Sequence, residues 1–279
     1  MATSGIPWRG PGEGRPDLPL PPGPMPLWRD RGLRKRWRYV GFYGEALMLC
    51  AARAEVGPLG QAFWVLWDRE RGRELAHTAL RPGSREVVLD GPRLVIDAPG
   101  VHADLHLGDA TPIESICPSG AGWGWTRKRA GVPMTGHVEV PGRRIPLDGF
   151  GVDDESSGYQ ARRTSWHWSA GVGTAADGRA LAWNLVEGIN DPPEKSERAI
   201  WVDGVPHEPA PVSFDGLDAV RFAEASRLDF TPGAERARDD NFLLVRSTYR
   251  HRFGTFSGRL DGIELAEGRG VMESHDALW

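Results

Sequence analysis

Short apolar runs separated by turn residues follow one another along most of the chain. Within these runs apolar and polar side chains tend to alternate, which is the two-residue period of a β-strand. Glycine, proline and aspartate interrupt the runs about every ten residues, a spacing typical of sandwiches and barrels. The pattern therefore predicts an all-β protein. Only Glu45 to Val56 fits a helix equally well, because its Ala, Leu, Met and Glu content favours one.

The clearest strand pair is a hairpin in residues 164–187. Its strands, 164–171 and 181–187, flank Asp177-Gly178, and Asp-Gly between two such runs is a strong hairpin signal. Alternation then assigns the side chains to two faces. Trp166 and Trp168 share one face with His167 opposite, and on the return strand Trp183 and Glu187 share a face with Asn184 opposite.

Composition divides the chain into three predicted parts. Residues 1–26 contain eight prolines and five glycines, too many for a helix or a paired strand, so we expect an extended arm. The β-rich segments 27–148 and 149–279 are each long enough for a domain with its own core. We predict one β-barrel or sandwich in each.

Charge, hydropathy and cysteine content argue against nucleic-acid-binding, membrane-spanning and secreted proteins. The net charge of −4 gives no field that would attract nucleic acid or acidic lipid. No apolar stretch approaches the roughly 20 residues of a membrane span, so we expect no stable membrane insertion. The first residues lack the pattern of a signal peptide, and Cys50 and Cys117 show no metal-binding spacing. A cytoplasmic protein is the expectation.

Several motifs of the second half resemble a known family. They are GYQARRTSWHWSAGVG, DGRALAWNLVEGIN, ERAIWVDG, FGTFSGRL and GVMESHDALW. Together they resemble a bacterial family of unknown function that is related to the AttH-type proteins and the carotenoid hydratases. This resemblance implies two lipocalin-like antiparallel β-barrels packed side by side. It also implies a hydrophobic ligand held in a barrel or between the two, and it transfers no catalytic residue.

Three consecutive acids, Asp153 to Glu155, offer a candidate for acid catalysis. Carboxylates crowded in a dry pocket keep one proton near neutral pH, as a general acid requires. Aromatic faces nearby would stabilise the positive charge that develops when an alkene is protonated. The alternative is that the acids form a solvated loop joining the two domains.

Further candidates lie on or beside the predicted hairpin and at the last strand. For catalysis we select Asp154, Glu155, His167 and Glu187. For ligand binding we select Trp123, Trp125, Tyr159, Trp166, Trp168, Trp183, Asn184, Asn190, Glu273 and His275. Core packing is an alternative for the tryptophans, and a structural hydrogen bond is one for His167.

One strand face carries His102, Asp104 and His106, which are respectable metal ligands by type. The outer two Cα atoms of such a strand lie about 13 Å apart, which opposes convergence on one ion. A polar outer face is the better interpretation, and we predict neither a metal nor a cofactor.

These observations lead to one functional prediction with two alternatives. We predict that an isoprenoid-like or polyketide-like hydrophobic molecule binds at the central hairpin. The leading activity is cofactor-independent acid/base hydration, isomerisation or cyclisation. A non-catalytic carrier or sensor would instead have an apolar cavity without paired titratable groups, and a carbohydrate-binding protein would have a shallow aromatic groove. The oligomeric state is not predicted.

Overall fold

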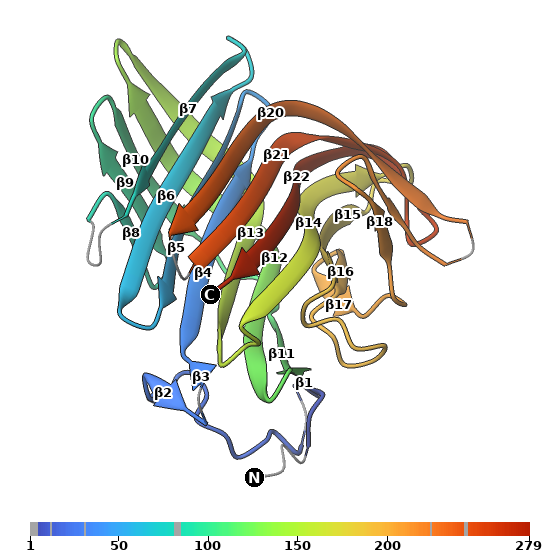
Figure 1. Cartoon of the computed structure of the whole chain (residues 1–279). Helices are drawn as coiled ribbons and strands as arrows, with labels where there is room; N and C mark the ends of the chain where they lie inside the picture. Colours follow the sequence, from blue (N-terminus) through green and yellow to red (C-terminus); the bar gives the residue numbers. More distant parts are fainter. Residues whose placement is uncertain (1–4, 12, 31, 81–84, 224, 243–244) are drawn as a thin grey trace.

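The computed structural model describes residues 5–11, 13–30, 32–80, 85–223, 225–242 and 245–279, and strands dominate it (Figure 1). These residues form two large antiparallel sheets and one small hairpin, and they contain no helix. The prediction of an all-β protein is therefore confirmed. In the same residues no helix is available to cross a membrane.

The first sheet is built from the first half of the chain. Its main path runs β7-β6-β5-β4-β13-β12-β10-β9-β8, and β11 joins it beside β12 and pairs with β1. Its strands are β1 (Trp8–Gly10), β4 (Lys35–Tyr43), β5 (Leu47–Val56), β6 (Leu59–Asp68), β7 (Arg73–Ala79), β8 (Val87–Asp90), β9 (Arg93–Ala98), β10 (Val101–Leu107), β11 (Ile113–Ser119), β12 (Gly122–Val140) and β13 (Arg143–Gly158). The small hairpin is β2 (Trp28–Arg29) and β3 (Gly32–Leu33).

The second sheet is built from the rest of the chain, in the order β17-β16-β15-β14-β22-β21-β20-β19-β18. Its strands are β14 (Arg163–Ala175), β15 (Ala180–Glu187), β16 (Ala199–Val202), β17 (Val205–His207), β18 (Ser213–Asp215), β19 (Ala219–Arg221), β20 (Arg227–Phe242), β21 (Val245–Leu260) and β22 (Ile263–Leu278). The predicted hairpin is the β14-β15 pair, and both of its faces carry the predicted side chains.

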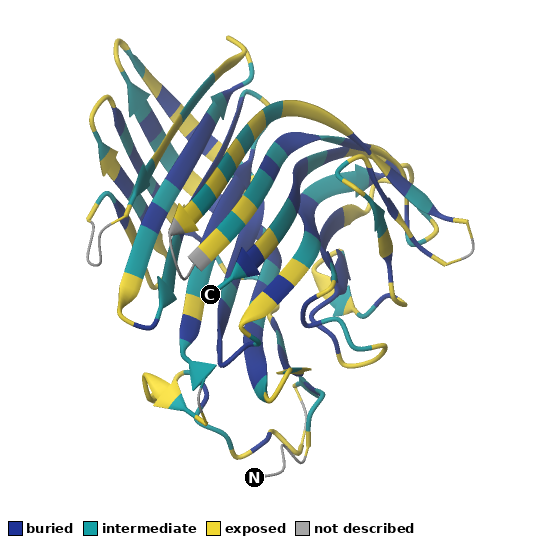
Figure 2. Ribbon diagram, viewed as in Figure 1, coloured by how far each residue is buried: buried dark blue, intermediate teal, exposed yellow. Residues whose placement is uncertain are grey.

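Three apolar clusters follow from strand alternation, and buried positions recur along the strands of both sheets (Figure 2). One cluster fills the first curled sheet around Leu49 and Leu105, and one fills the second around Trp183 and Leu228. The third lies between the two sheets and contains residues of both. The two halves therefore share a common apolar interface.

The stretch Glu45 to Val56, for which helix and strand were equally plausible, forms strand β5 from Leu47. Leu49 and Ala51 point into the first sheet's own core, whereas Met48 and Cys50 point toward the second sheet. Because both faces are buried, packing outweighs the helix propensity of the residues.

Two charged stretches form strands, which excludes the solvated loop considered for the acids. The acids of 153–155 lie within β13, and the charged stretch Pro232 to Asp240 lies within β20. Cross-strand ion pairs let such sequences form strands: Arg252 contacts Glu235, and Arg250 lies 3.0 Å from Asp239. Since β13 runs to Gly158, the first sheet continues ten residues past the boundary that was predicted at 148.

The expectation that the proline-rich arm contains no paired strand is wrong. Trp8–Gly10 pairs with β11. The arm also covers an apolar patch of the first sheet, formed by Ile116, Trp123, Trp125 and Tyr159, with Trp8, Leu20 and Met25. Burial of these side chains offsets the missing donors of the prolines.

Candidate functional site

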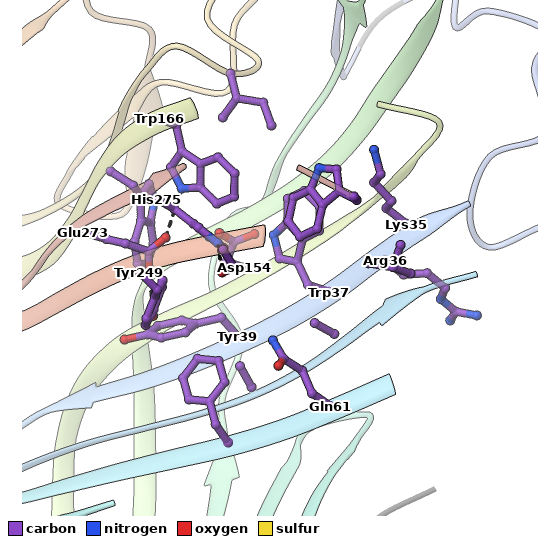
Figure 3. A pocket seen from close by; sticks show the side chains of 18 of the residues that line it. Lys35, Arg36, Trp37, Tyr39, Gln61, Asp154, Trp166, Tyr249, Glu273 and His275 are labelled. Atoms are coloured by element: carbon purple, nitrogen blue, oxygen red, sulfur yellow. Dashed lines mark hydrogen bonds between the residues drawn. The ribbon is translucent and has the colours of Figure 1, made fainter. Parts of the chain in front are cut away.

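A cavity lies where the two sheets face each other (Figure 3). Its walls come from β4, β5 and β6 on one side and from β14, β21 and β22 on the other. The space between the walls is about 1070 Å³ including the open mouth, which is the size of a small-molecule site. The aromatic part of the wall consists of Trp37, Tyr39, Phe63, Trp166, Trp168, Tyr249 and Trp279.

Glu273 is a buried carboxyl group in the wall of β22. The indole N–H of Trp166 donates to its Oε1 at 3.0 Å, and the Tyr249 hydroxyl donates to its Oε2 at 2.9 Å. Burial raises the pKa of Glu273 to about 7, although these two hydrogen bonds oppose the rise. Near neutral pH the group therefore exists both as an acid and as a carboxylate.

His275 lies two residues further along the same strand face. Its Nε2 is 2.8 Å from the Ser247 hydroxyl, and its ring centroid is 4.4 Å from that of Trp166. Burial lowers the pKa of His275 to about 4, so the imidazole is neutral near pH 7. The ring therefore offers the cavity a neutral hydrogen-bonding group and not a positive charge.

A second group of ionisable side chains also lines the cavity. Lys128 of β12 stands opposite Asp154 of β13 in the strand register, with Nζ 2.6 Å from Asp154 Oδ1. The same Nζ is 3.4 Å from Oε2 of Glu197, which also accepts a 3.0 Å hydrogen bond from Asn190. All four side chains are buried.

One ammonium group between two buried carboxylates sets the protonation of this cluster. Burial raises the pKa of Glu197 to about 7 against the opposing effect of Lys128, and the nearby Asp154 charge contributes to the rise. Burial also raises the pKa of Asp154. Since the carboxylates outnumber the ammonium, one of them retains a proton near neutral pH.

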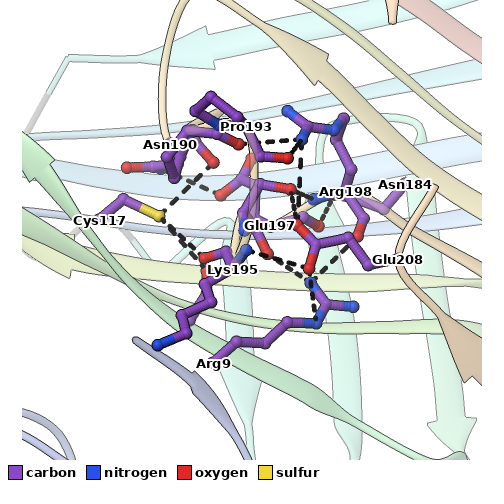
Figure 4. A network of polar contacts seen from close by, with 12 residues as sticks. Arg9, Cys117, Asn184, Asn190, Pro193, Lys195, Glu197, Arg198 and Glu208 are labelled. Atoms are coloured by element: carbon purple, nitrogen blue, oxygen red, sulfur yellow. Dashed lines mark hydrogen bonds and ion pairs between the residues drawn. The ribbon is translucent and has the colours of Figure 1, made fainter. Parts of the chain in front are cut away.

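Glu197 lies on the segment between β15 and β16, which polar contacts hold rigidly (Figure 4). The buried Arg198 guanidinium donates to the carbonyl oxygens of Asp191, Pro192 and Pro193. Arg9 of the arm donates to the carbonyl oxygens of Ser196 and Arg198. The arm thereby fixes the segment that brings Glu197 to the cavity.

The cavity brings together six of the residues selected from the sequence. They are Asp154, Trp166, Trp168, Asn190, Glu273 and His275. Asn184 lies just behind this wall, where its Oδ1 accepts a 2.8 Å hydrogen bond from the Trp168 indole.

The other selected residues lie elsewhere, which corrects their grouping into one site. Glu155 is on the opposite face of β13 from Asp154, because neighbouring strand residues point to opposite faces. His167 and Glu187 lie on the far face of the hairpin, where His167 stacks on Phe214.

The remaining aromatic candidates are packing residues. Trp183 is completely buried in the core of the second sheet. Trp123, Trp125 and Tyr159 pack beneath the proline-rich arm. The alternative interpretation of these residues, core packing, is therefore the one that fits.

Sequence reasoning missed Lys128, Glu197, Tyr249 and Trp37. Lys128 and Asp154 face each other across the long β12-β13 hairpin, whose register shifts at a bulge between Ala130 and Val132 that the sequence does not announce. A weak signal existed, since Lys128 is one of three lysines in a chain that otherwise uses arginine.

The described residues contain no cluster of three or more His, Cys, Asp or Glu side chains suited to a metal ion. On the strand that carried the candidate ligands, Asp104 is 2.6 Å from Arg93 and His102 is 3.7 Å from Asp97. The cavity itself offers acids, amides and aromatic faces, which suit proton transfer to an apolar ligand.

Comparison with known proteins places the chain in a family. The family model described as Domain of unknown function (DUF2804) matches residues 81–279, so the chain belongs to this family. No curated protein sequence matches the chain.

Solved structures are similar over nearly the whole length. Kievitone hydratase from Nectria haematococca aligns with a TM-score of 0.58 and 12% identity, over 88% of this chain and 89% of that one. A putative AttH protein from Nitrosomonas europaea aligns with a TM-score of 0.45 and 15% identity, over 92% and 98%. CghA aligns with a TM-score of 0.43 and 11% identity, over 87% of each chain. The predicted membership in a family of unknown function is confirmed, and so is the predicted all-β fold of two lipocalin-like barrels.

Proposed function

We propose that this member of the DUF2804 family binds a small hydrophobic molecule between its two sheets and transforms it by acid catalysis without a cofactor. The observation that carries the proposal is Glu273, whose pKa of about 7 keeps it partly protonated at neutral pH beside Trp166 and Trp168. A deep aromatic cavity with paired titratable groups favours this activity over a shallow sugar-binding groove. The solved structure with a TM-score above one half is named as a hydratase, which agrees with the proposal.

The proposed first step is proton transfer from the Glu273 carboxyl group to a carbon–carbon double bond of the ligand. A new C–H bond forms, the carboxyl O–H bond breaks, and the neighbouring alkene carbon becomes cationic. The indole faces of Trp37, Trp166 and Trp168 stabilise that charge. The hydrogen bonds from Trp166 and Tyr249 stabilise the carboxylate that remains.

A first experiment tests whether the cavity retains a bound small molecule. Native mass spectrometry of the purified full chain, followed by extraction under denaturing conditions, will detect a retained apolar molecule. We expect one lipophilic ligand per chain. Tryptophan fluorescence that responds to sugars and ignores apolar ligands would contradict the cavity proposal.

A second experiment separates an enzyme from a carrier. The full chain is incubated with kievitone, acyclic isoprenoids and polyketides, and products are identified by mass spectrometry. We expect Glu273→Gln to reduce turnover by about 100-fold or more while ligand binding is retained, and wild-type turnover to fall as pH rises through about 7, because the acid form of Glu273 is lost.

Glu264→Gln is the matched control, since Glu264 is exposed on the same strand. Equal turnover by the Glu273→Gln and Glu264→Gln variants would show that Glu273 is not the catalytic acid. Ligand binding with no conversion by the wild type would establish the carrier.

A further inference from the structure

Two buried amides, Asn190 in the cavity wall and Gln160 next to it, have polar atoms without a hydrogen-bond partner among the described residues. These atoms are Oδ1 of Asn190 and both Oε1 and Nε2 of Gln160. Each side chain is 4% exposed. Buried amide atoms normally have hydrogen-bond partners, so we expect a bound polar molecule beside these atoms.

Glycines let both amides approach the strand backbone closely. Gly124 of β12 and Gly158 of β13 are paired in the register. A Cβ atom on Gly124 would lie 2.7 Å from Asn190 Oδ1 and 3.3 Å from Gln160 Nε2, and one on Gly158 would lie 2.9 Å from the same nitrogen. The two amides therefore converge on this glycine pair from different parts of the chain.

A direct bond between the amides would not satisfy them. Joining Gln160 Nε2 to Asn190 Oδ1 would still leave Gln160 Oε1 without a donor. One or two waters supply donors for both oxygens and an acceptor for the nitrogen, and buried waters make about three such bonds.

The same amides are connected to the carboxylates. Nδ2 of Asn190 donates to Glu197, and Glu197 lies beside Lys128, which holds Asp154. Asn190 and both carboxylates line the cavity, as Glu273 does. The backbone of Asn190 is fixed as well, because its carbonyl oxygen accepts the Glu197 N–H at 3.1 Å.

We propose that Gln160 and Asn190 hold a reactive water at this wall of the cavity, that Asp154 and Glu197 accept its proton, and that the reaction is the addition of water to an alkene. This inference rests on the proposed function. After Glu273 has protonated the alkene, the water oxygen forms a C–O bond with the cationic carbon. The water's O–H bond breaks, and its proton passes to the carboxylate pair and then to solvent. Glu273 regains a proton from solvent, so the net change is alkene plus water to alcohol.

Crystallography of the full chain tests the water site without any substrate. We expect ordered water within hydrogen-bond distance of Asn190 Oδ1 and of a Gln160 amide atom, and we expect its loss in Gln160→Met, which keeps the side-chain length. Amides that bond to each other or to the backbone, with no ordered water beside them, would overturn the inference.

Isotope labelling tests the role of the water. The compounds of the preceding section are incubated in H₂¹⁸O, and we expect each product of the wild type to gain one ¹⁸O atom. Gln160→Met should lower ¹⁸O incorporation about 100-fold while alkene protonation, followed as deuterium uptake from D₂O, persists. Asn241→Leu, at an exposed amide of β20, is the control and should match the wild type.

The outcomes distinguish the two proposals. Products without ¹⁸O would overturn the water assignment and leave acid catalysis by Glu273 intact. Loss of deuterium uptake and ¹⁸O together in Gln160→Met would also overturn it, because a merely structural residue behaves that way. If the wild type converts nothing, the proposed catalysis fails and the reactive role of the water fails with it.

Discussion

At the scale of single residues, the buried carboxyl groups of the cavity have different partners. Glu273 accepts hydrogen bonds from Trp166 and Tyr249, whereas Asp154 and Glu197 form ion pairs with Lys128. The same burial raises the pKa of all three carboxyl groups. The side chains around each carboxyl group then determine whether it can donate or accept a proton near neutral pH.

Replacing Lys128 by Met leaves two buried carboxylates without a cation. We expect the free energy of unfolding at pH 8 to fall by about 3–5 kcal/mol, the usual cost of breaking a buried ion pair from one side. The pKa of Glu197 in the folded protein is already raised to about 7. Its contribution to stability is therefore full at low pH and is lost as pH rises through 7, so the variant should lose less at pH 5.

Urea unfolding at both pH values measures this effect. Lys195→Met is the control, because the Lys195 side chain is exposed. An equal loss for Lys128→Met at pH 5 and pH 8 would show that the cost comes from packing and not from charge.

At the scale of elements, the arm is as important as the strands. It covers Trp123, Trp125 and Tyr159, and through Arg9 it also holds the segment that carries Glu197. An extended segment without regular structure over most of its length thus supports a buried ionisable group on the other half of the chain.

A variant that begins at Leu27 should expose the indoles of Trp123 and Trp125. We expect red-shifted tryptophan emission and a loss of several kcal/mol of stability, since burying one large apolar side chain contributes roughly 1.5–3 kcal/mol and the arm buries Trp8, Leu20 and Met25. Fluorescence and urea unfolding check both expectations. Asp17→Ala, at an exposed position of the arm, should behave as the wild type.

Elements were easier to predict from the sequence than the site was. The β14-β15 hairpin was predictable because a turn signal and alternation are local. The placement of Glu155 and Glu187 depended on which strand face turns inward, and the pairing of Lys128 with Asp154 depended on a bulge that shifts the register of the β12-β13 hairpin. Turn signals and alternation do not encode these properties, so Lys128 and Glu197 were missed.

At the scale of the whole molecule, the cavity exists because two sheets meet without closing completely. Residues of both sheets form one apolar cluster beside the cavity. Close approach at Gly233 of β20 helps to set the spacing, because a Cβ atom there would lie 1.9 Å from the Trp67 ring of β6.

The methyl group added by Gly233→Ala should therefore push the two sheets apart at this contact. Overpacking of this kind costs about 1–3 kcal/mol, and we expect ligand affinity to fall as well, because the cavity walls move apart. Thermal unfolding and tryptophan fluorescence titration measure the two effects. Ala237→Val, at an exposed position of the same strand, is the control. If both variants show the same stability and the same ligand affinity, the contact at Gly233 does not set the spacing of the sheets.

The family match begins at residue 81, but the wall that carries Lys35, Trp37, Tyr39 and Phe63 precedes it. The groups proposed for proton transfer and water binding all lie inside the matched segment. A polypeptide cut at that boundary would keep the acids and lose the surface that faces them. Substitutions before residue 81 can therefore reshape one side of the cavity while the acids, and the aromatic residues Trp166, Trp168 and Tyr249 beside them, stay unchanged.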